Sequence, residues 1–112
     1  MLPAPAEDAI RQIITAISAG DYDDALARLN SSRCSASDLA RVVSDYGKTF
    51  AAPPFSEWDV ISIGRESGLE RWSVRAPFWS EGEGGRSDLE LHLTLAMNGQ
   101  NAVVDLDDFL VP

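Results

Sequence analysis

The sequence predicts an α+β domain in which three N-terminal helices pack on a four-stranded antiparallel meander sheet. Before the pair Pro53-Pro54, apolar residues recur every three or four positions, a spacing typical of amphipathic helices. After that pair they alternate with polar residues, as in strands that bury one face. A chain of 112 residues has the length of a single domain. We expect the helices over about 6–47 and the sheet over about 57–111.

Three helices are predicted from their apolar stripes and from the residues at their ends. Asp21 is placed to be the N-cap of the second helix. The third begins with Ser35 and Asp38 as an approximate capping box, or with Ser37 as the cap, and Gly47 is placed to end it in a left-handed conformation. The stripes consist of Ala6, Ile10, Ile13, Ile14 and Ile17, then Tyr22, Ala25, Leu26 and Leu29, then Leu39, Val42, Val43 and Tyr46.

Four strands are predicted in the second half of the chain. They cover 58–63, 72–79, 89–97 and 102–106, and a last apolar piece covers 109–111. Turn signals at Ser67-Gly68 and Asn98-Gly99 separate neighbouring strands. Pro77 predicts a bulge or an unpaired position in the second strand, because proline has no N–H to donate.

The acidity of the chain limits the classes of partner. It carries 18 acidic and 9 basic side chains, a net charge of −9. This charge repels nucleic acid phosphates and anionic lipids and attracts basic proteins, although acidity also serves solubility alone. We therefore expect no nucleic acid or membrane partner and, where the acidity serves binding, a basic protein partner.

The location of the protein is predicted from its cysteine usage and its apolar runs. Cys34 is the single cysteine, so the chain forms no internal disulfide and fits a reducing compartment. The start of the chain has neither the basic nor the apolar region of a signal peptide. No run approaches the roughly 20 apolar residues of a membrane span. A cytoplasmic protein is expected.

Catalytic and metal-binding patterns are missing from the sequence. The chain has one histidine, and no glycine-rich phosphate loop follows a strand. The acidic run Asp21, Asp23 and Asp24 lacks the glycine and the distal glutamate of a calcium loop, and it fits the first turn of a helix instead. We expect no enzyme activity, no cofactor and no metal.

A polar cluster is predicted on one face of the sheet. Glu90 and His92 alternate with leucines, so they face away from the core. Arg75 or Pro77 of the preceding strand comes near them if the two strands pair across the acidic loop. The cluster is either a polar pocket or a solvent-facing group of cross-strand neighbours.

The segment 79–88 is predicted to be a long acidic loop. Trp79 offers an aromatic anchor, Glu81, Glu83 and Asp88 offer carboxylates for a basic partner, and Arg86 lies among them. Reversing the charge of the three acids should then slow association. In the alternative interpretation, Trp79 packs under the loop and Arg86 pairs with Glu81 or Glu83.

Three stretches of the sequence resemble a small bacterial family of unknown function over about 6–111. They are GDYDDAL, DYG and WSVRAPFWSEGEGGRSDLELHLTL. The layout of that family is similar to the cystatin-like group that includes nuclear transport factor two. The resemblance implies no assigned activity, and domains of this kind occur among small accessory proteins, including neighbours of bacterial toxins. Cystatin-like folds often bind a small molecule between sheet and helices.

Three functional hypotheses follow. The first is a non-enzymatic acidic protein-binding domain, most specifically an immunity-type protein that neutralises a basic bacterial toxin such as a nuclease. The alternative is a small-molecule-binding or catalytic domain with a pocket near Tyr46, Trp58 and Trp72. The third is an oligomerisation module whose exposed sheet residues pair with a second copy. That surface would carry either Ile61 and Ile63, or Ser73, Arg75 and Trp79.

Overall fold

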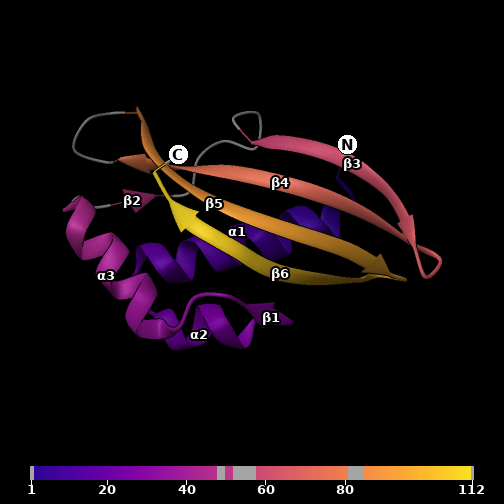
Figure 1. The fold of residues 1–112 in the computed structure, drawn as a ribbon, viewed down its shortest axis with the longest axis horizontal. Helices are drawn as coiled ribbons and strands as arrows, with labels where there is room; N and C mark the ends of the chain where they lie inside the picture. Colours follow the sequence, from indigo (N-terminus) through magenta and orange to yellow (C-terminus); the bar gives the residue numbers. More distant parts are fainter. Residues whose placement is uncertain (1, 48–49, 52–57, 81–84, 112) are drawn as a thin grey trace.

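The computed structural model describes residues 2–47, 50–51, 58–80 and 85–111. These residues form three helices and a six-stranded mixed sheet, which confirms the α+β class (Figure 1). The elements are α1 (Ala4–Ser18), α2 (Tyr22–Ala27), β1 (Ser31–Ser32), α3 (Ala36–Tyr46), β2 (Phe50–Ala51), β3 (Asp59–Glu66), β4 (Leu69–Ser80), β5 (Gly85–Asn98) and β6 (Asn101–Leu110).

The four long strands form the predicted antiparallel meander, but the prediction of a four-stranded sheet was wrong. The order is β1-β6-β5-β4-β2, with β3 also paired to β4. The two additional strands have two residues each, and β1 runs parallel to β6. Backbone hydrogen bonds from Asn30 N to Val104 O (2.8 Å) and from Arg33 N to Leu106 O (3.0 Å) flank β1. Two residues are too few for an alternating pattern, so these strands leave no signal in the sequence.

The bulge predicted at Pro77 is confirmed. The register between β4 and β5 shifts between Pro77 and Trp79. On its other edge, β4 pairs with β3 up to Arg75 and with β2 from Trp79. Pro77 therefore lies in the gap between the two partner strands, where a missing N–H costs no hydrogen bond.

The start and the end of α3 follow the predicted chemistry. Asp38 N donates to Ser35 Oγ (3.1 Å), and Ser35 N donates to Asp38 Oδ2 (2.9 Å), so the capping box is complete. Gly47 ends the helix at φ 74°, a left-handed conformation that costs glycine little. Asp21 precedes α2 as predicted, although its side chain makes no capping hydrogen bond.

The predicted loop over 79–88 is shorter than expected. Ser80 pairs with Gly85, and β5 already includes Arg86 and Asp88. The glycines concealed the start of this strand, because they carry no side chain that could show alternation. Residues 81–84, with the predicted Glu81 and Glu83, lie outside the described residues.

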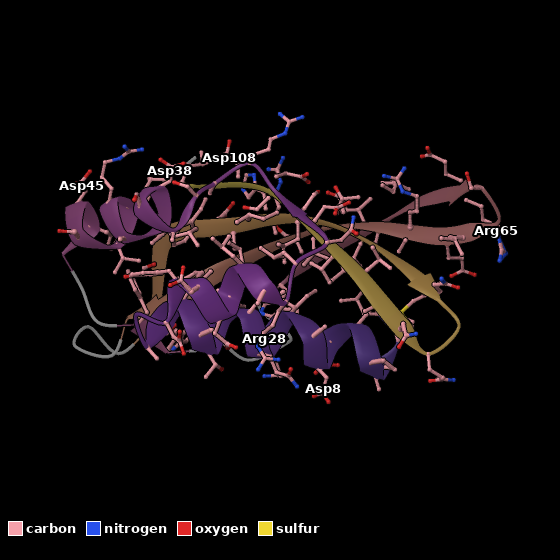
Figure 2. The ribbon with its side chains drawn as sticks, turned by 90° about the horizontal axis from the view of Figure 1, so that it is seen from below. Asp8, Arg28, Asp38, Asp45, Arg65 and Asp108 are labelled. Atoms are coloured by element: carbon pink, nitrogen blue, oxygen red, sulfur yellow. The ribbon has the colours of Figure 1, made fainter. Side chains whose placement is uncertain are left out.

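The core lies between α1 and one face of the sheet. The predicted stripe of α1 is fully buried, and it meets the inward residues of β4, β5 and β6. In Figure 2, α1 and α2 lie along one side of the sheet, while Asp108 lies on the other side. Within the described ranges, no helix is long and apolar enough to cross a membrane.

Candidate functional site

The sheet face opposite α1 carries a row of charged residues, one from each long strand. Asp59 of β3 is paired with Arg75 of β4, Arg75 with His92 of β5, and His92 with Asp108 of β6. Directly paired residues of neighbouring strands have their side chains on the same face. We call this row and its neighbour Glu90 the polar sheet face.

The predicted cluster of Arg75, Glu90 and His92 is brought together on the polar sheet face. His92 Nε2 lies 2.9 Å from Glu90 Oε1, and their side chains are 20% and 12% exposed. The pair is a hydrogen bond when the imidazole is neutral and an ion pair when it is protonated. Pro77 is paired with Glu90, so both predicted neighbours on β4 come near the cluster. A carboxylate in this place orients an imidazole, but orientation alone does not establish catalysis.

Strand β6 adds two carboxylates beside the row. Asp107 Oδ2 accepts a hydrogen bond from Thr94 Oγ1 (2.6 Å). Asp105 Oδ1 accepts from Asn30 Nδ2 (3.0 Å) and from Ser31 Oγ (2.8 Å), and so holds β1 on the sheet. Neither interaction supplies a positive charge, so the negative charge of both carboxylates remains.

The surface carboxylates differ in whether an arginine neutralises them. Within the described part, Arg11, Arg28, Arg41, Arg65 and Arg71 pair with Glu7, Asp24, Asp38, Glu70 and Glu66. No ion pair of the described residues involves Asp59, Asp88 and Asp108 on the sheet side or Asp8, Asp21 and Asp23 on the helix side. Within the described residues, much of the excess negative charge thus lies on aspartates without a basic partner.

The residues of the predicted partner-binding loop lie mainly on strands. Trp79 is half-buried and is paired with Arg86 across β4 and β5. Asp88 is exposed, and its backbone N–H donates to the hydroxyl of Tyr46 (3.0 Å). The pairing of β5 with β6 ends at Glu90 and Leu110, so β6 offers no acceptor to the Asp88 amide. The Tyr46 hydroxyl accepts the hydrogen bond from this amide instead.

The structure separates the three residues of the predicted small-molecule pocket. Trp58 and Trp72 are 6% and 5% exposed and belong to the core, and the guanidinium of Arg11 stacks 5.4 Å from the ring centroid of Trp58. Trp72 borders a cleft next to Pro3 near the hairpin ends, whereas Tyr46 lines a different cleft beside α3. We name the latter the α3 cleft.

The α3 cleft was not predicted from the sequence. Its volume is about 310 Å³, and it is lined by Val42, Asp45, Tyr46, Leu89, Phe109, Leu110 and Val111. These residues come from α3, the start of β5 and the end of β6, so they are far apart along the chain. In the structure, Val42, Val43 and Tyr46 of α3 are only half-buried, and the sequence pattern does not show this incomplete cover.

Strand β3 carries the exposed apolar residues of the predicted oligomerisation surface. Ile61 and Ile63 are 59% and 46% exposed. The register of β3 shifts between Ser62 and Gly64, and Gly64 has φ 90°. A bulge in an edge strand hinders its pairing with another chain. Homodimer formation stays a prediction.

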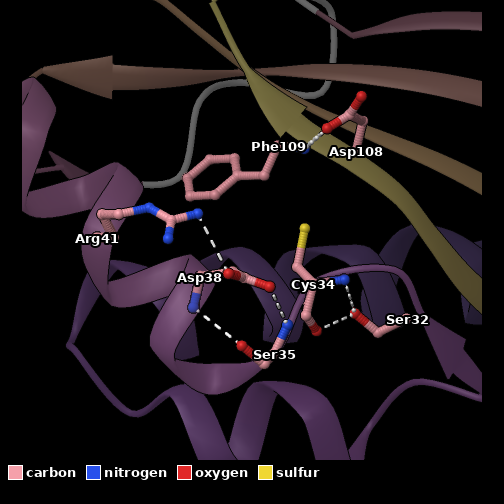
Figure 3. Close-up of polar contacts among 7 residues, drawn as sticks. All are labelled: Ser32, Cys34, Ser35, Asp38, Arg41, Asp108 and Phe109. Carbon is pink, nitrogen blue, oxygen red and sulfur yellow. Dashed lines mark hydrogen bonds and ion pairs between the residues drawn. The ribbon is translucent and has the colours of Figure 1, made fainter.

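Cys34 lies between β1 and α3, with its sulfur directed toward Phe109 and Asp108 (Figure 3). Its N–H donates to Ser32 Oγ (3.0 Å), and the Ser32 hydroxyl donates to the Cys34 carbonyl oxygen (2.6 Å). Burial raises the pKa of the Cys34 thiol, and the negative charges of Asp108 and Asp38 raise it further. The fold therefore favours the neutral thiol.

The raised pKa predicts slow reaction of Cys34 with a disulfide reagent. At a pH of about 8 we expect the native chain to react more slowly than the urea-unfolded chain, because less thiolate is present. The Asp108→Asn variant should react faster than the native chain, and Asp45→Asn serves as the control. The stability that the neutral thiol contributes is fully present below its ordinary pKa and is lost as the pH rises through the folded pKa. Equal rates for native chain and Asp108→Asn would contradict the electrostatic cause.

Within the described ranges, no group of three or more His, Cys, Asp or Glu side chains is placed to hold a metal ion. A search of the curated proteins and a search of the solved structures found no match to this chain. One family model matches residues 14–112, nearly the whole chain. The chain belongs to the family described as "Domain of unknown function (DUF7668)".

Proposed function

We propose that the protein is a non-enzymatic acidic protein-binding domain, and that within this class it is an immunity-type protein that neutralises a basic bacterial toxin such as a nuclease. The observation that carries the proposal is the group of aspartates that no arginine of the described residues neutralises. With the net charge of −9, they create a field that steers a basic protein toward this chain.

The resemblance described above supports the finer parts of the proposal. It implies a bacterial protein with a cystatin-like layout, from a kind of domain found among the neighbours of toxins. A toxin that acts on nucleic acid needs a basic surface to bind phosphates. An acidic domain that covers this surface blocks it by charge complementarity and by occupying its space. We place this action in the cytoplasm.

The polar sheet face is the proposed contact surface. Four neighbouring strands hold the backbone of its charged row in a paired sheet, so this part of the backbone does not have to become ordered on binding. Arg75 makes no ion pair among the described residues, and it gives the surface one positive position for a carboxylate of the partner.

Two variants with equal charge test the proposal. One replaces Asp59, Asp88 and Asp108 by Asn, and the control replaces Asp8, Asp21 and Asp23 by Asn. All six side chains belong to exposed residues, and each variant removes three negative charges. The tagged chains are used to capture partners from lysate of the source cells at low salt, and the partner is then purified for stopped-flow measurement.

One stoichiometric basic partner is expected. Its association rate should fall about tenfold or more with the sheet-side variant and much less with the helix-side control, because steering depends on where the charge lies. Co-expression of this chain should also relieve the toxicity of the partner in bacterial cells. Equal association rates for the two variants would show that only the net charge matters and would contradict the proposed contact surface. A toxin that remains active in the bound complex would contradict the immunity function.

A further inference from the structure

We infer that the α3 cleft is the anchor site for an apolar side chain of the partner, flanked in the partner by lysine or arginine. The inference rests on the proposed function and names the place where the basic partner would be held most tightly. Binding energy at protein interfaces is concentrated in a few apolar or aromatic side chains that enter a pocket surrounded by polar residues. The α3 cleft has both parts of this arrangement.

The floor of the cleft is apolar and fixed before binding. Leu89 is fully buried and Phe109 is 3% exposed. The rings of Phe109 and Phe78 lie 5.0 Å apart, those of Phe78 and Phe50 lie 5.3 Å apart, and those of Phe50 and Tyr46 lie 5.5 Å apart. This chain of rings joins α3 to β2, β4 and β6, so the cleft does not have to be assembled when the partner arrives.

The rim offers apolar surface to a ligand. Val42, Tyr46 and Leu110 are half-buried, and Val111 is 52% exposed. A volume of about 310 Å³ lies near the lower limit of ordinary ligand pockets, which begin at roughly 300 Å³. One side chain such as leucine or phenylalanine fits such a cleft better than a large cofactor does.

The charges around the cleft select a cationic neighbour for this side chain. Asp45 lines the cleft and makes no ion pair among the described residues. Asp88 and Asp108 directly precede Leu89 and Phe109, so their side chains lie on the opposite face of their strands and not in the lining of the cleft. Figure 2 shows Asp45, Asp38 and Asp108 on the same side of the molecule. The Asp38 charge is balanced by Arg41 (3.2 Å), so Asp45 supplies the uncompensated carboxylate of the lining.

The other clefts fit this role less well. The cleft between α1 and α2 is lined by Arg11 and Arg28 as well as by aspartates, so its charges are partly balanced. The cleft beside Trp72 contains both Arg65 and Glu70. Among these three sites, only the α3 cleft joins an apolar floor to a lining carboxylate without a lining arginine.

The direct test uses three short capped peptides as probes of the native chain. Acetyl-Arg-Leu-Arg-amide should shift the backbone amide signals of Tyr46, Leu89 and Leu110 in a saturable manner. Acetyl-Arg-Ala-Arg-amide removes the apolar side chain, and acetyl-Glu-Leu-Glu-amide reverses the charge, so both should bind several-fold more weakly. Equal binding of the leucine and alanine peptides would overturn the inference, as would shifts confined to α1 and α2. A neutral metabolite that saturates the same amides more tightly than the leucine peptide would overturn it too.

The second test compares two double variants in binding to the captured partner. Asp45→Asn/Val111→Ala changes the cleft, and Asp8→Asn/Ile63→Ala removes the same charge and a similar exposed apolar group elsewhere. We expect the cleft variant to weaken the complex about tenfold and the control to change it little. If the complex depends on Asp59, Asp88 and Asp108 but not on the cleft variant, the proposed function stands and the anchor site fails. If no basic partner is captured, the proposed function fails. The peptide titration then shows by itself whether the α3 cleft binds an apolar side chain flanked by basic residues.

Discussion

The Phe78→Ala variant is expected to lose about 3–5 kcal/mol of its free energy of unfolding, as is usual for a phenylalanine removed from a core. Phe78 is fully buried and lies between the rings of Phe50 and Phe109, so alanine would leave a cavity bordered by β2 and β6. A domain of this kind has roughly 5–15 kcal/mol in total, so the loss is a large part of its stability.

Urea denaturation followed by circular dichroism measures this loss as a lower midpoint at an unchanged slope. The Ile61→Ala variant is the control, because Ile61 is 59% exposed on β3 and its truncation should change stability by at most about 0.5 kcal/mol. If Phe78→Ala lost less than about 1 kcal/mol of its free energy of unfolding, the packing of Phe78 between the rings of Phe50 and Phe109 would not be important for stability.

Local chemistry explains why α3 could be predicted from the sequence. The capping box at Ser35 and Asp38 and the left-handed Gly47 involve residues close together in the chain. These interactions do not depend on the rest of the fold, so residue type alone indicates them. The same holds for the turn at Ser67 and Gly68, where both residues have positive φ.

Strand β6 shows how one bulge hides a continuous strand. The sequence predicts two apolar pieces, yet the structure has one strand, Asn101–Leu110. Leu93 pairs with Leu106 while His92 pairs with Asp108, so Asp107 is the additional residue and the alternation changes phase there. The adjacent Asp107 and Asp108, which interrupt the alternation of apolar and polar residues, therefore mark a bulge within one strand and not a loop between two.

The candidate site was predictable only where pairing is local. Arg75 and His92 belong to adjacent strands of a hairpin, so the alternation of polar and apolar residues is enough to place them on one face. The α3 cleft depends instead on how Asp45, Tyr46 and Val111 come together from distant parts of the chain. Residue spacing carries no information about such a contact.

The Trp72→Ala variant is expected to lose about 3–5 kcal/mol, because Trp72 is a core residue in this fold. It is 5% exposed and paired with Leu95 on β5 and with Ser62 on β3, so its ring covers the core near the hairpin ends. The Trp79→Ala variant is the matched control, since the same change is made on the same strand at a half-buried position. Its loss should be smaller, because less apolar area leaves water when this ring folds.

The two tryptophan variants also separate packing from ligand binding. If Trp72 served a pocket for a metabolite, its replacement would remove the thermal stabilisation by that ligand while leaving the ligand-free chain nearly as stable as before. Packing predicts the opposite result, a large loss in the ligand-free chain. The urea midpoints of both variants, measured without added ligand, distinguish the two roles. If Trp72→Ala loses no more free energy of unfolding than Trp79→Ala does, packing is contradicted and Trp72 is again a candidate ligand-binding residue. A core role is consistent with our proposal that a partner binds at the α3 cleft and the polar sheet face and not at Trp72.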